Sequence, residues 1–342
     1  MYKLEDIREV HLEISSQCNA RCPECPRNYR GFPYNDGYPE CSLTYEQAQL
    51  IFHHSFLQQL DSILINGNYG DIVMCDDALD IIKYFKRINP GLDILISTNG
   101  SARKESFWCE LAKLGCRIEF DLDGLEDTHT LYRQNTNWNT VIKNAQAFID
   151  AGGHAIWKFI EFKHNIHQQY DCQQLAKQMG FSVFRAVSEG RDTGPVYDKQ
   201  GNLVHVLGDF TKHDNGTPHD TVIPYFQKRK EQQLLFDDIA SYFTPQPRID
   251  CEVQRTKSIY ITANGEVYPC CYLGFYPKTS VGFGEQLEIM NKQLQPLIGN
   301  NNALEHTLEE CISWFNKIEE SWSCSTFKAG RLMKCDQQCG AK

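Results

Sequence analysis

The chain contains the stretch Cys18-Asn19-Ala20-Arg21-Cys22-Pro23-Glu24-Cys25 near its N-terminus. It has the spacing C-x3-C-x2-C, so three thiolates can ligate three irons of one 4Fe–4S cluster and leave the fourth iron without a protein ligand. Clusters with four cysteine ligands mainly carry electrons, whereas an open iron can bind a small molecule. The motif therefore predicts an iron–sulfur cluster at Cys18, Cys22 and Cys25 that binds a small molecule.

Two other interpretations of the three cysteines remain open. They could form a zinc knuckle, or they could be buried thiols, which are common in protein cores. A structural zinc site usually has a fourth Cys or His nearby, and none lies between Tyr29 and Glu40. The iron–sulfur interpretation is favoured on this ground.

Composition limits the class of protein. The chain has 342 residues, enough for one large domain or for a large and a small one. Its 34 Lys and Arg stand against 44 Asp and Glu, a net charge of -10, which speaks against binding bulk nucleic acid. No apolar run precedes Cys18 and none is long enough to span a membrane, so we expect a cytoplasmic protein without membrane partners.

The fifteen cysteines gather at the two ends of the chain. In a long chain without a signal peptide, metal ligation is a better explanation for them than disulfide bonds. The first group is the N-terminal motif, and a second group lies beyond residue 250. This second group comprises Cys251, Cys270, Cys271, Cys324, Cys335 and Cys339. The six other cysteines are scattered and are expected to be small buried hydrophobic residues.

Apolar runs alternate with helical patterns through the first half of the chain. For example, Thr44-Tyr45-Glu46-Gln47 has capping-box spacing and is followed by apolar residues at helical intervals. Six strand–helix units in about 175 residues predict an α/β fold with a parallel sheet, a partial (β/α)6 TIM-type barrel. The expected strands cover residues 10–14, 63–65, 92–96, 116–122, 155–160 and 181–185.

Polar loops follow the first four predicted strands. They are the cysteine loop, residues 66–71, residues 97–99 and residues 121–124. In a parallel sheet the carboxyl ends of the strands meet at one edge, where active sites lie. These four loops are therefore expected to converge on one site, which a zinc knuckle would not require.

The cysteine motif, its position after the first strand, and these loops resemble the radical S-adenosylmethionine (SAM) superfamily. Glu24 and Ile72 depart from it, since an aromatic residue and a proline are common at these places. The resemblance implies that the open iron binds SAM, which one electron cleaves to methionine and a 5′-deoxyadenosyl radical. It also implies a SAM site formed by Gly67, Asn68, Tyr69, Gly70, Asp71, Ser97, Asn99, Asp121 and Arg133.

The roles implied for these residues differ. Backbone carbonyls of the glycine turn at residues 67–71 would receive the SAM ammonium, because glycine permits a close approach. Ser97 and Asn99 would hydrogen-bond the ribose hydroxyls, and Arg133 would pair with the SAM carboxylate. Asp121 stands where relatives often have serine. As alternatives, each of these segments can be an ordinary turn, and Arg133 a solvated charge.

A second pattern joins the C-terminal cysteines. Cys251 precedes and Cys270 follows a predicted hairpin, residues 259–262 and 266–268, turning at Asn264-Gly265. The order C-x13-G-x4-C with a late cysteine pair resembles the SPASM and twitch domains, which hold auxiliary 4Fe–4S clusters. This implies one auxiliary cluster on Cys251, Cys270, Cys335 and Cys339, with Cys324 as an alternative to Cys335. A zinc ribbon is the competing interpretation.

Together these patterns predict a radical SAM barrel at residues 1–188, a loop-rich connector at 189–247, and a twitch/SPASM-like domain at 248–342 with a β-hairpin and a helix. The expected function is a radical SAM oxidoreductase or modifying enzyme that abstracts hydrogen from a peptide or protein. Alternatives are a radical SAM enzyme acting on a sugar, nucleoside or other small molecule, and a non-enzymatic zinc scaffold. The resemblance further implies an electron donor such as flavodoxin or ferredoxin, and no catalytic acid or base is assigned.

Overall fold

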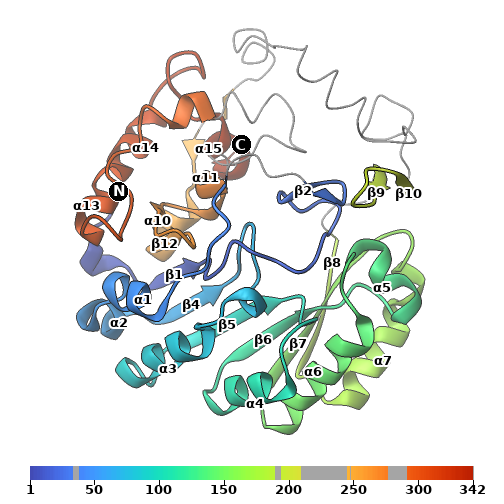
Figure 1. The fold of residues 1–342 in the computed structure, drawn as a ribbon. Coiled ribbons are helices and arrows are strands. Elements are labelled where there is room, and N and C mark those ends of the chain that lie inside the picture. The colour runs from blue at the N-terminus through green and yellow to red at the C-terminus, as the bar shows by residue number, and fades with distance from the viewer. Residues whose placement is uncertain (34–37, 189–193, 209–244, 247, 276–290, 342) are drawn as a thin grey trace.

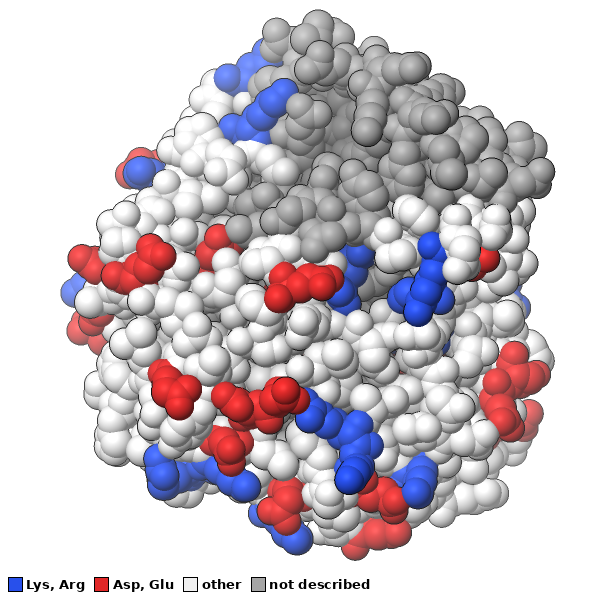
Figure 2. Space-filling view, viewed as in Figure 1, with Lys and Arg blue, Asp and Glu red and all other residues white. Residues whose placement is uncertain are grey.

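The structure is a computed structural model that describes residues 1–33, 38–188, 194–208, 245–246, 248–275 and 291–341. Within these residues, no helix combines the length and the apolar character needed to span a bilayer. On the face drawn in Figure 2, acidic and basic side chains are intermixed over the described surface. The described part of this face has no extended basic patch of the kind that binds nucleic acid.

One curved sheet of eight strands forms the centre of the molecule, in the order β13-β12-β1-β4-β5-β6-β7-β8 (Figure 1). Neighbouring strands from β12 to β8 are parallel, and only β13 is antiparallel to its neighbour. The predicted α/β partial barrel is confirmed. The strands are β1 (Glu9–Leu12), β4 (Ser62–Ile65), β5 (Asp93–Thr98), β6 (Arg117–Asp121), β7 (His154–Ile160), β8 (Val183–Val187), β12 (Ser258–Ile261) and β13 (Val267–Tyr268).

Helices cover the outer face of the sheet. Strand residues that point outward, such as Ile94, Ile96 and Phe120, are fully buried against them. Residues one position away, such as Ser97 and Glu119, point to the inner face, because side chains alternate along a strand. The connecting helices are α1 (Tyr45–Ile51), α2 (His54–Gln59), η2 (Ile72–Met74), α3 (Ala78–Ile88), α4 (Glu105–Lys113), α5 (Glu126–Tyr132), α6 (Trp138–Asp150), η3 (Ile166–Gln168) and α7 (Gln169–Met179).

Local sequence signals explain where several helices begin. The predicted capping box at α1 is present. The Gln47 backbone N–H donates to the Thr44 hydroxyl oxygen, and the Thr44 backbone N–H donates to the Gln47 side-chain oxygen. Thr307 and Glu310 form the same arrangement at α13 (Leu308–Ser313). Each box satisfies backbone N–H groups that have no partner in the first helical turn.

The predicted C-terminal hairpin is present, but it is part of the barrel sheet. β12 pairs in parallel with β1, with His11 opposite Tyr260 and Leu12 opposite Ile261. Its residues Ile259, Tyr260 and Ile261 are buried. This pairing was not predicted, because it joins residues about 250 positions apart and local periodicity carries no information on such partners.

Two small hairpins lie over the cysteine loop. β2 (Asn28–Tyr29) pairs with β3 (Phe32–Pro33), and β9 (Gly194–Tyr197) pairs with β10 (Leu203–Leu207). The Tyr197 N–H donates to the Arg30 carbonyl at 2.8 Å. Val196 and Leu207 pack with Cys22 in a small second core. The described part of the predicted connector therefore includes a strand pair that covers the cysteine loop.

The C-terminal part packs beside β1 and the N-terminus (Figure 1). The Met1 amino group pairs with Glu319 on α14 at 2.9 Å. The elements here are η1 (Leu4–Asp6), β11 (Arg248–Ile249), α10 (Glu252–Thr256), α11 (Cys271–Phe275), α13, α14 (Phe315–Ser321), α15 (Met333–Cys339) and β14 (Gly340–Ala341). The division into three domains stays a prediction, because residues 189–193, 209–244 and 247 lie outside the described residues.

Candidate active site

The four polar loops converge on one cavity of about 310 Å³. All three cysteines of the N-terminal motif and all nine residues of the expected SAM site line it. These residues are Cys18, Cys22, Cys25, Gly67, Asn68, Tyr69, Gly70, Asp71, Ser97, Asn99, Asp121 and Arg133. The convergence expected from parallel strands is thus observed, and it brings together segments up to about 115 residues apart in the chain.

Hydrogen-bond donors point at the sulfur atoms of the cysteine loop. The Cys18 sulfur accepts from the Ala20 backbone at 3.3 Å and from Asn99 Nδ2 at 3.6 Å. The Cys22 sulfur accepts from Arg133 Nη1 at 3.7 Å. Donors directed at cysteine sulfurs are typical of iron–sulfur sites, where they tune the ligands.

The bare thiols are in an environment that opposes their ionisation. Burial raises the pKa of Cys22 to about 12, although Arg133 acts in the opposite direction. Burial, together with Asp71 and the two other thiols, raises the pKa of Cys18 well above its usual value. A bound cation would reverse this balance, because thiolates are stabilised by metal coordination.

The donor set fits a multi-iron cluster. Within the part of the chain that the structure describes, no three His, Cys, Asp or Glu side chains lie close enough to hold one metal ion. Three cysteines that line one cavity, with donors directed at two of their sulfurs, match the protein ligands of a 4Fe–4S cluster that keeps one iron open. The three cysteines would hold this cluster.

The glycine turn after β4 is held in place by buried acceptors that the sequence analysis did not identify. Glu13 Oε1 accepts from the backbone N–H of Tyr69 at 2.6 Å and of Gly70 at 3.0 Å. A side chain at position 70 would lie 1.7 Å from the Ser15 carbonyl oxygen, which explains the glycine. The turn therefore packs directly against the segment after β1.

Asp71 ties the glycine turn to the end of β5. Its Oδ1 accepts from the Thr98 hydroxyl at 2.6 Å and from the Val73 backbone at 3.1 Å. Its Oδ2 accepts from the Asn99 backbone at 2.8 Å and from Asn99 Nδ2 at 2.7 Å. Burial raises the pKa of Asp71, and these hydrogen bonds oppose the shift. In this structure Asp71 orients Asn99, which also contacts Asn19.

Arg133 is fully engaged with two carboxylates and a thiol. Its Nε donates to Asp123 at 2.6 Å, and its Nη1 lies 3.2 Å from Asp121. Burial alone would lower the pKa of Arg133, but Asp121 and Asp123 raise it well above its ordinary value. Arg133 therefore holds a permanent positive charge beside Cys22.

Two further charged residues face the cavity side of the sheet. Lys158 on β7 lines the cavity and lies 3.7 Å from Asp121 and 3.5 Å from Glu119. Glu119 also accepts from the Ser97 hydroxyl at 3.2 Å. The sequence analysis missed Lys158 and Glu119. A signal was available for Lys158, which is a charge within the apolar run of β7. Glu119 gave no such signal, because β6 also contains Arg117 and Asp121.

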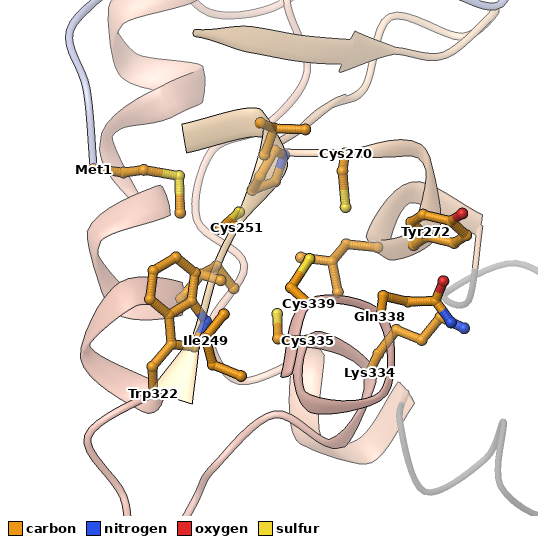
Figure 3. Close-up of a pocket in the computed structure, with 14 residues that line it drawn as sticks. Met1, Ile249, Cys251, Cys270, Tyr272, Trp322, Lys334, Cys335, Gln338 and Cys339 are labelled. Atoms are coloured by element: carbon orange, nitrogen blue, oxygen red, sulfur yellow. The ribbon is translucent and has the colours of Figure 1, made fainter. Parts of the chain in front are cut away.

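The four favoured C-terminal cysteines meet in a second pocket. Cys251, Cys270, Cys335 and Cys339 line it with apolar side chains that include Trp322. Figure 3 shows the four thiols facing a common space from different elements. Cys251 caps α10, Cys270 precedes α11, and Cys335 and Cys339 lie one helical turn apart on α15.

Backbone pairing brings the ends of this pocket together. β11 pairs with β14, and the Asp250 N–H donates to the Cys339 carbonyl at 2.7 Å. Arg331 Nε donates to Asp336 on α15 at 2.8 Å, and Arg331 Nη2 donates to the Gln246 carbonyl at 2.8 Å. Cys339, Gly340 and Ala341 are therefore held beside Cys251.

Two thiols of the second pocket, those of Cys251 and Cys339, shift each other's pKa. A hydrogen bond from the Cys251 thiol lowers the pKa of Cys339 to about 6 and raises that of Cys251. Lys334 also lines the pocket, and burial lowers its pKa to about 8. Cys324, the alternative to Cys335, does not line the pocket, and neither does Cys271.

Of the histidines in the predicted connector, His205 lies within the described residues. His205 Nε2 bonds the Leu131 carbonyl at 3.0 Å. His213 and His219 lie outside the described residues.

No protein-family model and no curated protein matches the sequence. Among solved structures, Streptococcus suis SuiB bound to S-adenosylmethionine matches with a TM-score of 0.53 at 15% identity, over 98% of this chain and 71% of SuiB. Another SuiB structure covers 83% of this chain and 65% of its own length, with a TM-score of 0.52.

A second protein has the same architecture. Native anSMEcpe with bound AdoMet (S-adenosylmethionine) matches with a TM-score of 0.53 at 13% identity, over 98% of this chain and 92% of that one. At these identities the similarity is one of fold. The chain has the fold of these S-adenosylmethionine-bound proteins, which is the fold expected from its resemblance to the radical SAM superfamily.

Proposed function

We propose that this protein is a radical SAM enzyme, which cleaves SAM reductively and abstracts hydrogen from a substrate. The observation that carries this proposal is the single cavity at the carboxyl ends of β4 to β7. There the C-x3-C-x2-C thiols lie beside all nine residues of the expected SAM site. A zinc knuckle would account for the thiols but not for the other loops around them.

Cys18, Cys22 and Cys25, which line the cavity, would hold the first 4Fe–4S cluster. When bound and reduced, this cluster supplies the electron that splits SAM into methionine and a 5′-deoxyadenosyl radical. Asn99 and the Ala20 backbone donate to the Cys18 sulfur, and Arg133 donates to that of Cys22. These groups would offset the negative charge that three thiolates bring into a buried site.

The remaining loops would hold SAM. The turn at residues 67–70 offers backbone acceptors for its ammonium group, and Ser97 and Asn99 lie at the end of β5 for its ribose. Arg133 is already paired with Asp121 and Asp123, so it would meet the SAM carboxylate while keeping these partners. Lys158 is a further cation on the same cavity wall.

The second pocket would hold an auxiliary 4Fe–4S cluster on Cys251, Cys270, Cys335 and Cys339. Four thiols from three elements supply a full set of protein ligands, as in clusters that carry electrons. When bound, this group would supply an acceptor for an electron from the substrate radical, or an anchor for the substrate. Lys334 lies among these thiols and would offset part of their charge.

The favoured substrate is a peptide or protein. SuiB is also known bound to the precursor peptide SuiA, with a TM-score of 0.50 to this chain, and anSMEcpe with the Cp18Cys peptide, with a TM-score of 0.52. A sugar, nucleoside or other small molecule is the alternative. We further propose reduction by a flavodoxin or ferredoxin, and a cytoplasmic location.

Iron content separates this proposal from a zinc scaffold. Purified without oxygen, the protein is expected to be brown and to carry about eight irons in two clusters. A colourless protein loaded with zinc would contradict the proposal. To identify the substrate, the reduced protein is incubated with SAM and candidate peptides or small molecules, and a mass change is sought together with 5′-deoxyadenosine.

A further inference from the structure

A buried carboxylate lies behind the glycine turn and has no role in the function proposed above. Glu13 follows β1 directly and is 1% exposed. Its Oε1 accepts from the N–H groups of Tyr69 and Gly70, and its Oε2 accepts from the Tyr260 hydroxyl at 2.9 Å. Burying a carboxyl group is costly, so a site that satisfies both of its oxygens indicates a specific role.

The direction of the two N–H groups fixes the direction of two carbonyls. No peptide bond among the described residues is cis, and in a trans peptide the C=O points opposite to the N–H. The Asn68 carbonyl shares a peptide plane with the Tyr69 N–H, and the Tyr69 carbonyl shares one with the Gly70 N–H. Both carbonyls therefore point away from Glu13. The turn lines the cavity and Glu13 does not, so the side of the turn opposite Glu13 is the side that faces the cavity.

A second residue on the same face of β1 supports the turn. His11, two positions before Glu13, has its Nε2 2.5 Å from the Asn66 carbonyl oxygen. Its ring packs edge-on against Tyr260, with the centroids 4.9 Å apart. Burial lowers the pKa of His11 to about 4, so it is neutral and donates one N–H to this carbonyl. β1 and β12 thus hold the turn from behind.

The glycine at position 67 fits the same arrangement. A Cβ there would lie 2.7 Å from Glu13 Oε1, closer than van der Waals contact allows. Glycine is therefore required for the turn to approach the carboxylate. Gly67 therefore leaves room for the Glu13 carboxyl group next to the turn.

We propose that Glu13 is a positioning residue, which turns the carbonyls of Asn68 and Tyr69 toward the cavity so that they accept hydrogen bonds from the SAM ammonium. This inference rests on the proposed function. A backbone turn without this anchor can rotate its peptide planes at little cost, and the two acceptors would then no longer be aimed at the cation. Glu13 acts on binding through the turn and does not touch the reacting atoms.

The test compares Glu13→Ala, Glu13→Asp and Glu13→Gln in the reconstituted full chain. The KM for SAM and kcat are measured from 5′-deoxyadenosine formation. Glu13→Ala is expected to raise this KM about tenfold, as for the loss of the hydrogen bonds that hold the turn, with little change in kcat. Glu13→Asp keeps a carboxyl group, but its side chain is one methylene too short to reach the turn, so its KM rises as well.

Glu13→Gln is the rescue. Its amide oxygen can accept from the same two N–H groups, so its KM for SAM is expected within about threefold of the wild type. Asp93→Asn is the matched control, because Asp93 begins β5 at the opposite end of the sheet and pairs with Arg117. It removes a carboxylate without touching the turn, and its KM is expected to be unchanged.

The outcomes separate the two claims. If the wild type neither binds nor cleaves SAM, the proposed function fails, and the role of Glu13 fails with it. If the wild type cleaves SAM but Glu13→Asp keeps the wild-type KM, only the role of Glu13 is wrong. Should Glu13→Ala fail to fold, the comparison of Glu13→Asp with Glu13→Gln decides, since a purely structural carboxylate gives no change in KM at equal iron content.

Discussion

Single residues in this protein act mainly through buried hydrogen bonds. Asp71 and Arg133 at the cavity, and Glu13 behind the glycine turn, each join two or more chain segments. Sequence reasoning identified Asp71 and Arg133, because they lie in loops that resemble those of a known family. It missed Glu13, since a glutamate at the end of a short strand has no local pattern that separates a buried position from an exposed one.

Glu13 is expected to make stability depend on pH. Burial raises its pKa from 4.5 to about 7, in spite of hydrogen bonds from Tyr69, Tyr260 and Gly70 and the charge of Arg27. Cys41 is a further titratable neighbour. The native state keeps a proton that the unfolded chain has lost, so this stabilisation is full below pH 4.5 and is lost as the pH rises through 7.

The shift from 4.5 to about 7 corresponds to about 3 kcal/mol. Glu13→Gln cannot titrate, so it isolates this effect. Thermal unfolding midpoints of both reconstituted proteins are compared at pH 5 and pH 8. We expect the wild type to lose stability relative to Glu13→Gln at pH 8, by several degrees. Parallel curves for the two proteins would show that Glu13 keeps an ordinary pKa.

Asp71→Ala is expected to destabilise the protein by about 3 kcal/mol and to weaken SAM binding, because buried donors on Thr98 and Asn99 lose their acceptor. The measurements are the unfolding midpoint and the SAM dissociation constant. Asp76→Ala is the control. Its side chain is 94% exposed and pairs with Arg103 on the surface, so little change is expected. Equal stability of the two variants would rule out this role for Asp71.

At the scale of elements, the site depends on close backbone approaches between loops. The strand–helix alternation could be predicted from periodicity alone, and all six predicted strands are present. The additional helix α5 and the strand pair β9–β10 were not predicted. Both are short, and their burial comes from tertiary contacts around the cysteine loop, as for Val196 and Leu207.

Gly70→Ala tests the approach of the glycine turn to the segment after β1. A Cβ at position 70 would lie 1.7 Å from the Ser15 carbonyl oxygen, which forces the backbone apart. We expect loss of SAM binding, measured by equilibrium dialysis, together with a lower unfolding midpoint. Gly91→Ala is the matched control, because its Cβ would meet only Asn89 Oδ1 at 3.6 Å. Unchanged SAM binding by Gly70→Ala would contradict this geometry.

At the scale of the whole molecule, the N-terminal and C-terminal parts share one sheet. β12 lies between β13 and β1, and the Tyr260 hydroxyl reaches Glu13. Asn68 Nδ2 in the glycine turn also donates to the Cys271 carbonyl at 2.9 Å, next to the second cysteine pocket. The sequence allowed both cysteine groups to be located but not their connection, because long-range strand pairing leaves no trace in local patterns.

A shortened chain that ends at residue 188 tests whether the N-terminal part needs the C-terminal strands to fold. It would lose β12, leaving the backbone of β1 without its parallel partner and exposing residues such as Leu12. We expect this shortened chain to aggregate, as an unpaired strand edge promotes association. Solubility, size-exclusion chromatography and circular dichroism of the two chains provide the measurement. A soluble, monomeric shortened chain with intact secondary structure would show that residues 1–188 fold alone.

The most direct test of the proposed function is 5′-deoxyadenosine formation by the reduced, reconstituted protein with SAM, compared with that of Cys22→Ala. The wild type is expected to carry about eight irons and to form 5′-deoxyadenosine, and Cys22→Ala to keep about four irons in the C-terminal site and to form none. A fully loaded wild type that leaves SAM intact, or a Cys22→Ala protein that still cleaves it, would contradict the proposal.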